Sequence, residues 1–188
     1  MKRIYALIVI AAIMGTIITT ATVMPSANNN RIQGVPARSL AASPPQTAWN
    51  STYGGTGDDL AYSVQQTSDG GYVAAGFTTS FGASQSDLYI LKTNSTGEIQ
   101  RNKKYGKSSN DGAYSVQQTS DGGYIAAGFT ASFGAGSSDF WLVKTDSSGN
   151  HQWNKTYGGT NEDLFAGVIL TVDGGFAVAG KTRSFGAG

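Results

Sequence analysis

The stretch AYSVQQTSDGGY, residues 61–72, returns letter for letter at residues 113–124 and in a weaker form, FAGVILTVDGGF, at residues 165–176. The tyrosines that precede the copies keep one spacing of 52 residues: Tyr53, Tyr105 and Tyr157. Internal similarity at a fixed period of this length is the sequence signature of a repeat architecture. The chain is therefore expected to fold as tandem copies of one structural unit.

One copy of the unit contains four strand-like runs separated by turn residues: 62–67, 72–78, 87–92 and 98–105. The first run alternates apolar and polar residues, which is typical of a half-buried strand. The SDGG sequence after it joins two glycines to an aspartate that can bond its own backbone, and it predicts a tight hairpin turn. The third run is apolar without alternation, which indicates a strand covered on both faces. The fourth is polar and rich in lysine, as sheet edges commonly are.

Four antiparallel strands that end at a charged edge describe one blade of a β-propeller. Blades typically repeat every ~40–50 residues, and the period of 52 lies just beyond that range. A solenoid would need fewer and longer strands, and a sandwich gives no reason for such a period. We therefore predict an all-β fold of β-propeller-type blades, about two and a half in number. The predicted boundaries are strand 48–53, blade 54–105, blade 106–157 and partial blade 158–188.

The repeat region also carries the motifs of a known family. Across residues 48–188 it combines WNKTYGG, AYSVQQTSDGGYIAAGFT, SFGAG and VKTDSSGN. In these motifs the chain resembles the tandem β-propeller repeat family of archaeal and bacterial secreted and cell-surface proteins. The resemblance implies a propeller, or a segment of one, outside the cytoplasm. It implies no catalytic residues.

The N-terminal part of the chain differs from the repeats. Residues 1–24 begin with MKR and continue in a mostly apolar run of roughly 20 residues, which is typical of a signal peptide and long enough for a membrane anchor. Residues 25–47 hold all 4 prolines, and their composition predicts a disordered linker. We expect a secreted or cell-surface protein that meets the membrane only through its N-terminal segment. Its glycosylation candidates are Asn50, Asn94 and Asn154.

The composition excludes several kinds of chemistry. Cysteine is absent and His151 is the only histidine, so neither a zinc site nor a Ser-His-Asp triad can be assembled. Four of the 13 basic residues precede the repeats (Lys2, Arg3, Arg31 and Arg38), so 9 remain there against 12 acidic residues, with no basic stripe for nucleic acid. Carboxylates for a glycan hydrolase are present, but they recur at equivalent positions, as structural repetition produces. We expect no catalytic residue and no cofactor.

Two pairs of residues are candidates for ligand contact. Asp87 and Asp139 open the buried third strand of their copies, where they could bind a cation or a sugar near the centre of a ring, or bond the loop backbone. Phe81 and Phe133 lie in the SFGA loops. Aromatic residues in loops stack on sugars or grip peptides, and they also anchor turns.

A glycine-rich stretch before the first strand is a candidate calcium site. GGTGDDL, residues 54–60, resembles the glycine-aspartate repeats of calcium-binding β-rolls, which makes Asp58 and Asp59 the candidate ligands. Those repeats work in tandem every nine residues, and tandem repetition is absent here. The alternative is a structural turn that Asp59 caps, as Asp111 and Asp163 would in the later copies.

These features predict an exported, non-catalytic binding or scaffold module at the cell surface, with an extracellular glycan or protein as its ligand. The alternatives are a glycan-cleaving or lyase-type propeller enzyme with active residues in missing blades, and a structural component of the cell envelope. The third copy stops after two strands at SFGAG, whereas propellers usually have ~4–8 blades. The chain is therefore expected to be a fragment of a longer propeller or to assemble with copies of itself.

Overall fold

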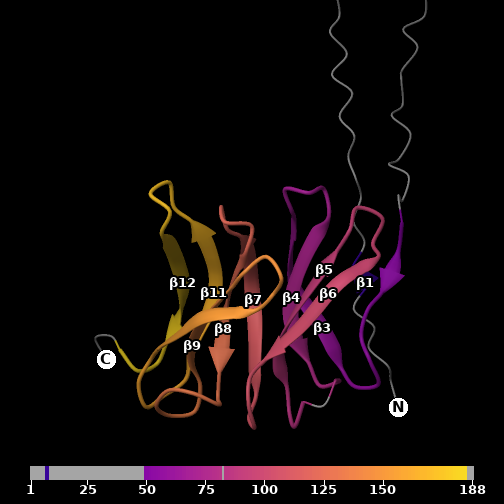
Figure 1. The fold of residues 1–188 in the computed structure, drawn as a ribbon. Helices are drawn as coiled ribbons and strands as arrows, with labels where there is room; N and C mark the ends of the chain where they lie inside the picture. Colours follow the sequence, from indigo (N-terminus) through magenta and orange to yellow (C-terminus); the bar gives the residue numbers. More distant parts are fainter. Residues whose placement is uncertain (1–6, 9–48, 82, 186–188) are drawn as a thin grey trace, which may run out of the picture.

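A computed structural model describes residues 7–8, 49–81 and 83–185 (Figure 1). Every element in this part of the chain is a β-strand, and the predicted all-β class is confirmed there. The strands are β1 (Leu7–Ile8), β2 (Ser51–Thr52), β3 (Asp59–Gln66), β4 (Tyr72–Thr78), β5 (Asp87–Thr93), β6 (Ile99–Tyr105), β7 (Asp111–Gln118), β8 (Tyr124–Thr130), β9 (Asp139–Thr145), β10 (His151–Tyr157), β11 (Asp163–Leu170) and β12 (Phe176–Thr182).

Consecutive strands from β3 onward pair antiparallel into three sheets. The first sheet has the order β3-β4-β5-β6, the second has the order β7-β8-β9-β10, and the third contains β11 and β12. The register repeats as well, since Asp59 lies opposite Thr78 in the first sheet and Asp111 lies opposite Thr130 in the second. One copy of the sequence repeat therefore forms one four-stranded antiparallel sheet, as predicted.

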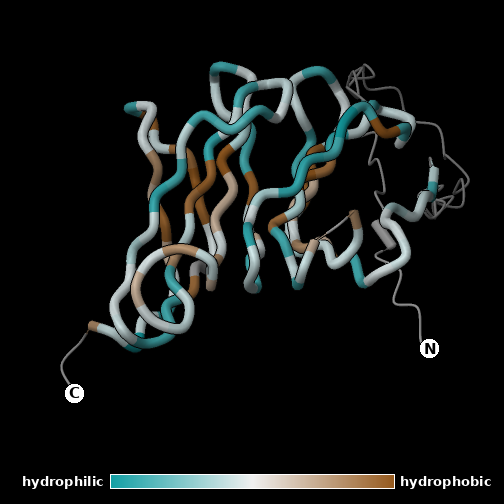
Figure 2. The backbone as a smooth tube through the Cα atoms, turned by 60° about the horizontal axis from the view of Figure 1, so that its bottom comes forward, coloured by the Kyte–Doolittle hydropathy of each residue, from teal (hydrophilic) through white to brown (hydrophobic). Residues whose placement is uncertain are grey.

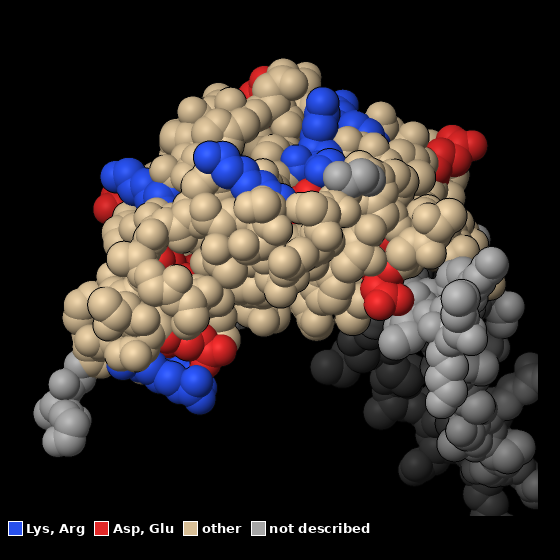
Figure 3. Space-filling model, turned by 90° about the horizontal axis from the view of Figure 1, so that it is seen from below, with Lys and Arg blue, Asp and Glu red and all other residues tan. Residues whose placement is uncertain are grey.

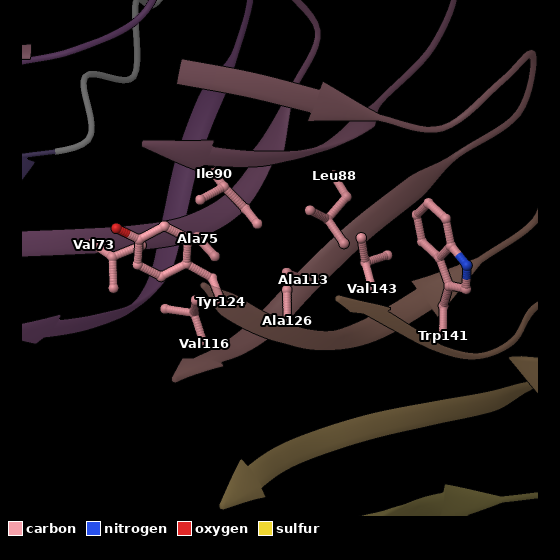
Figure 4. Close-up of a cluster of buried hydrophobic side chains, with 10 residues drawn as sticks. All are labelled: Val73, Ala75, Leu88, Ile90, Ala113, Val116, Tyr124, Ala126, Trp141 and Val143. Carbon is pink, nitrogen blue, oxygen red and sulfur yellow. The ribbon is translucent and has the colours of Figure 1, made fainter. Parts of the chain in front are cut away.

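The three sheets stack face to face in chain order (Figure 1). β7 packs against β3, β4 and β5, and β11 packs against β7, β8 and β9. A buried hydrophobic cluster fills the junction between the first and second sheets (Figure 4), and its larger members are Val73, Leu88, Ile90, Val116, Tyr124 and Trp141. A second cluster joins the second sheet to the third, and contains Ile125, Ala127, Leu142 and Val168. Burial of apolar surface at these two junctions holds the sheets together.

The third and fourth strands of the first two copies have the burial that the sequence pattern predicts, whereas in β3 the apolar Tyr62 and Val64 are half exposed. All 7 residues of β5 are buried, and β9 is almost as fully covered. The polar strands β6 and β10 are sheet edges and are mostly exposed. Figure 2 shows the hydrophobic segments along the strands inside the stack and hydrophilic segments at many of the turns.

Glycines at the centres of β4 and β8 allow two backbones to meet closely. A β-carbon at Gly128 would lie 1.9 Å from the carbonyl oxygen of Gly112 on β7, and the equivalent contact in the first sheet is equally close. The first strand carries one extra residue beside this contact, Tyr62 in β3 and Tyr114 in β7. Such an insertion is a β-bulge, which bends the strand and re-aims its side chains.

The strand predicted at residues 48–53 is shorter in the structure. β2 contains only Ser51 and Thr52, and it pairs with β1 instead of joining a four-stranded sheet. Tyr53 next to it reaches the turn between β5 and β6, where its hydroxyl donates to the carbonyl oxygen of Gly97 at 2.5 Å. The tyrosine at the end of β6 makes the equivalent bond to the second sheet. The conserved spacing of these tyrosines therefore has a structural cause.

The predicted N-terminal segments are almost entirely outside the described residues. Of the signal or anchor segment 1–24, only Leu7 and Ile8 are described, and the linker 25–47 lies wholly outside. Within the described residues, no helix is long and apolar enough to cross a membrane.

Candidate functional site at the junctions between sheets

A buried aspartate at the start of each sheet ties the first two strands together. Asp111 opens β7 and accepts hydrogen bonds from the hydroxyls of Thr130 and Ser132 at the end of β8, the latter at 2.6 Å. The N–H of Lys107 donates to the same carboxylate at 3.1 Å. The other two sheets begin with the same arrangement of threonine, serine and backbone donors. In each of the three sheets, this carboxylate therefore holds the beginning of the first strand to the end of the second.

A second buried aspartate meets the first one at the junction between neighbouring sheets. Asp87 opens β5, and Nζ of Lys104 on β6 donates to its Oδ2 at 2.7 Å. Its Oδ1 is buried and has no hydrogen-bond partner among the described residues. A β-carbon at Gly106 would lie 2.2 Å from Asp87 Oδ1 and 2.5 Å from Asp111 Oδ2. Two carboxylate oxygens from different sheets therefore lie beside one glycine. The distance between these two oxygens cannot exceed the sum of the two distances.

The junction between the second and third sheets repeats this geometry. A β-carbon at Gly158 would lie 1.9 Å from Asp139 Oδ1 and 2.7 Å from Asp163 Oδ2. The N–H of Ala135 donates to Asp139 Oδ2 at 2.6 Å. Asp139 is 2% exposed, Asp163 is fully buried, and Asp139 Oδ1 has no hydrogen-bond partner in the described part of the chain.

The two junctions differ at a charged position on the edge strand beside the carboxylates. Lys104 on β6 lies opposite Tyr89, and Thr156 on β10 lies opposite Trp141, so threonine occupies at the second junction the position that lysine has at the first. None of the ion pairs between described residues involves either carboxylate of the second junction. The second junction therefore lacks the cationic partner that the first one has.

The two carboxylates of the second junction ionise differently. Burial raises the pKa of Asp139, the N–H of Ala135 opposes this, and the negative charge of Asp163 adds to it. Burial also disfavours the charge on Asp163, but the hydroxyls of Ser184 and Thr182, together with backbone N–H groups, hold its pKa far below the usual range. Asp163 is thus the ionised member of the pair, and Asp139 is the member whose charge lacks compensation.

The predicted loop phenylalanines lie against the strands that follow their loops. Phe81 stacks on Tyr89 with ring centroids 5.5 Å apart, and Phe133 packs on Trp141 at 5.4 Å. Nζ of Lys107 lies 4.8 Å from the centre of the Phe133 ring. Both phenylalanines therefore anchor their loops, and Phe81 still leaves 48% of its surface exposed. They do not meet Asp87 or Asp139 in one shared site.

The bulge tyrosines Tyr62 and Tyr114 belong to an aromatic row. The rings of Tyr62 and Tyr114 are 5.2 Å apart, although they belong to different sheets. Phe77 and Phe129 extend the row on either side, at 6.1 and 5.7 Å from the nearest tyrosine. Tyr62 is 50% exposed, so the row presents a partly open aromatic surface. The identical position of the tyrosine in two copies is the signal that indicates this contact.

A buried lysine that binds the aspartate of the SDGG turn was not predicted from the sequence. Nζ of Lys92 donates to Asp69 at 2.9 Å, to the carbonyl of Thr93 at 2.7 Å and to Gln100 at 3.0 Å, while its side chain is 3% exposed. The hydroxyl of Thr67 and the ammonium of Lys92 together hold the pKa of Asp69 well below its usual range. The second sheet repeats this contact with its own lysine and aspartate. The aspartate of the SDGG turn therefore has a structural partner.

The remaining predicted positions are dispersed. Asp58 is exposed on the turn before β3, whereas Asp59 is buried in the hydrogen bonds of its own sheet. Among the glycosylation candidates, Asn50 is exposed, Asn94 accepts hydrogen bonds within its own turn, and Asn154 accepts one from a tryptophan of β9. Within the described residues, no group of three or more His, Cys, Asp or Glu side chains could hold a metal ion.

The surface carries mixed charges and an open groove. Figure 3 shows a mostly uncharged face on which basic side chains gather mainly across the upper middle, with acidic side chains around them. A groove between the second and third sheets is lined mainly by apolar side chains, among them Phe140, Trp153, Phe176 and Val178. No family model and no curated protein matches this sequence. The function must therefore be inferred from the chemistry of these residues.

Proposed function

We propose that each four-stranded sheet is one blade of a β-propeller, and that the chain is an exported, non-catalytic binding or scaffold module at the cell surface. The consecutive antiparallel order of the strands, the face-to-face stacking of the sheets and the lysine-bearing edge strands support the propeller. In this arrangement β11 and β12 are the first two strands of a third blade. Residues 1–24 would direct the chain out of the cytoplasm as a signal or anchor.

The observation that carries the binding role is the pair of bulge tyrosines. Blades surround a central channel, and because the charged edge strand is outermost, the first strand of each blade would line that channel. Tyr62 and Tyr114 would then lie side by side on the channel wall, 5.2 Å apart, with half of the Tyr62 surface exposed. A tyrosine ring offers an apolar face to a sugar ring and a hydroxyl for hydrogen bonding. An extracellular glycan, rather than a protein, is therefore the proposed ligand.

The non-catalytic role is favoured by how the polar residues are used. Asp111, Asp121 and Lys144 recur in other copies, and each is engaged by hydrogen bonds within its own sheet. The carboxylate pair of Asp139 and Asp163 is at most 2% exposed and cannot touch a polymeric substrate without movement. Paired acids in glycoside hydrolases must flank the bond that they cleave.

A glycan array read for both retention and sugar release tests the proposal. The full chain should retain at least one class of extracellular glycan and release no product. Replacing both tyrosines, Tyr62→Ala with Tyr114→Ala, should weaken binding by about tenfold or more, because a stacking surface is lost. Tyr157→Ala is the matched control, since this tyrosine is 48% exposed but lies on the edge strand β10.

Each alternative function predicts a different result in that assay. Release of sugar would contradict the non-catalytic role and favour a glycan-cleaving or lyase-type propeller. A folded protein that neither binds nor cleaves any glycan would contradict glycan binding and favour a structural component of the cell envelope.

A further inference from the structure

The first junction between sheets contains its own counter-ion. Asp87 and Asp111 point at Gly106 from two different sheets. Nζ of Lys104 lies 2.7 Å from Asp87, and the lysine side chain reaches it from a position that is 37% exposed. Two buried carboxylates and one ammonium therefore share this junction, and the excess negative charge is reduced from two to one.

The second junction has the same pair of carboxylates without the ammonium. Thr156 replaces the lysine, and no ion pair of the described residues reaches Asp139 or Asp163. Two neighbouring carboxylates away from water repel each other, and each one loses its hydration. Asp139 Oδ1 is buried, accepts no hydrogen bond from a described residue, and faces Asp163 across Gly158. An unpaired buried oxygen of this kind requires a partner. Asp87 Oδ1 at the first junction is also unpaired, so the missing ammonium is what sets the second junction apart.

We propose that the second junction binds a calcium ion between Asp139 and Asp163. The ion replaces the positive charge that Lys104 supplies at the first junction. Calcium fits better than magnesium, because calcium accepts oxygen ligands in flexible geometry whereas magnesium requires a nearly ideal octahedron and keeps its waters. The described residues bring no third acidic side chain to the pair. The remaining ligands are therefore neutral oxygens from the backbone, from side chains or from water.

The position of the site predicts both its affinity and its role. Sites with few charged ligands in extracellular modules bind calcium with dissociation constants of about 10⁻⁴–10⁻³ M. Asp139 belongs to β9 and Asp163 belongs to β11, so the ion ties the second sheet to the third. This site is separate from the tyrosine row, and it does not depend on the proposed glycan ligand.

A shared proton is the competing explanation for the same geometry. A proton on Asp139 would also relieve the repulsion and would give Oδ1 a hydrogen to donate to Asp163. The proton requires no calcium, and it would leave the stability of the protein at neutral pH independent of this ion. The two explanations therefore separate in a calcium titration.

Equilibrium dialysis and thermal unfolding of the full chain at neutral pH test the proposal. After removal of metal with EDTA, the protein should take up one calcium ion per chain. The melting temperature should rise by about 5–15 °C at a calcium concentration one hundred times the dissociation constant. No uptake up to about 10 mM calcium would overturn the proposal, because that concentration exceeds the weakest expected dissociation constant.

The internal repeat supplies matched variants in both directions. Thr156→Lys places an ammonium where the first junction has one, and it should abolish calcium uptake while the protein stays folded without calcium. Lys104→Thr removes the ammonium of the first junction and should raise uptake from one ion to two per chain. Asp139→Asn should abolish uptake as Thr156→Lys does.

Comparison of calcium uptake among these variants shows where the ion binds. Uptake that persists in both Thr156→Lys and Asp139→Asn would place the ion elsewhere, for example at Asp58, and would overturn the proposal. A single ion bound by Lys104→Thr would contradict the argument that the lysine and the calcium ion have the same role. Near-ultraviolet circular dichroism of each variant checks that the protein remains folded.

Discussion

At the residue scale, the fold depends on buried polar groups that each require a particular partner. Asp111 is fully buried and accepts hydrogen bonds from two hydroxyls and one backbone N–H. The ammonium of Lys144 is nearly as well covered and contacts Asp121, Gln152 and a carbonyl oxygen. Because an unsatisfied buried group costs about 1–3 kcal/mol, these contacts explain why the same residues recur in each copy. Asp87 and Asp139 differ from these residues, since one carboxylate oxygen of each lacks such a partner among the described residues.

The stability of the metal-free protein should depend on pH through Asp139. The pKa of Asp139 is raised above the ordinary value of 3.8 in the folded state, with Asp163 as the nearest charge and Glu162 beside it in the chain. The contribution of its proton is complete below the ordinary pKa and is lost as the pH rises through the raised pKa. In EDTA, the wild type should therefore lose stability relative to Asp139→Asn as the pH rises above the ordinary pKa of 3.8 and through the raised pKa of Asp139.

Thermal unfolding of both proteins at several pH values measures this difference. Calcium should abolish the dependence, since the ion then compensates the charge. A difference in melting temperature that stays constant over the whole pH range would show that Asp139 does not titrate there.

Gly128→Ala should strongly destabilise the second sheet. The new methyl group would meet the carbonyl oxygen of Gly112 at 1.9 Å, so the β-bulge of β7 would have to move. Overpacking of this kind costs about 1–3 kcal/mol and occasionally more. Gly167→Ala is the control, because nothing lies within 4 Å of its β-carbon position. Urea unfolding should show a lower midpoint for the first variant only, and equal midpoints would contradict the close approach.

At the element scale, the strands differ in how much stability the protein should lose when a side chain is removed. β5 is buried along its whole length between its neighbours and the adjoining sheet, whereas β6 beside it is an edge. β12 belongs to a sheet of two strands, and most of its residues are exposed. The stability of each strand is therefore set by how many of its faces and edges are covered.

Leu88→Ala should destabilise the protein far more than Ile99→Ala. Leu88 on β5 is fully buried in the cluster between the first and second sheets, while Ile99 on β6 is 51% exposed. Leucine-to-alanine changes in cores cost about 2–5 kcal/mol, and surface changes usually remain within about 0.5 kcal/mol. Urea unfolding measures both values. Similar losses for the two variants would contradict the assignment of the core.

At the scale of the whole molecule, the third sheet exposes several large apolar side chains. Val172 on its turn is fully exposed, Ile169 is 61% exposed and Val178 is 41% exposed. The groove beside this sheet is lined by further apolar residues of the second sheet. Apolar patches on soluble proteins commonly mark sites of association.

The chain of 188 residues should therefore self-associate through the third sheet. Sedimentation velocity should show a mass that rises with protein concentration. Val178→Asp should reduce this association, because a carboxylate would have to be desolvated in the contact. Ile99→Asp, at an exposed position on β6, should leave it unchanged. A monomer at all concentrations would contradict the prediction.

The sequence by itself determined the repeat unit, the four strands within it and the burial of the third and fourth strands. These features depend on local patterns: alternation in β3, continuous apolar residues in β5, lysines in β6 and glycines in the turns. A local pattern can be read in one copy, and three copies at one spacing show which residues are equivalent between the copies. The N-terminal strand was predicted too long, because its extent depends on the partner with which it pairs.

Only the tertiary structure decided which side chains of different sheets meet. Asp139 and Asp163 come together because β9 and β11 stack across a junction, and Tyr62 and Tyr114 meet because two bulges align. The equal positions of Tyr62 and Tyr114 in two copies indicate their contact. The contact between Asp139 and Asp163 does not follow from spacing, since packing of sheet on sheet selects partners by face and height rather than by order in the chain. The sequence shows that threonine occupies position 156, the equivalent in the next repeat of Lys104. The sequence does not show that Asp139 thereby lacks a cationic partner, because this carboxylate is distant from Thr156 in the chain and near it only in space.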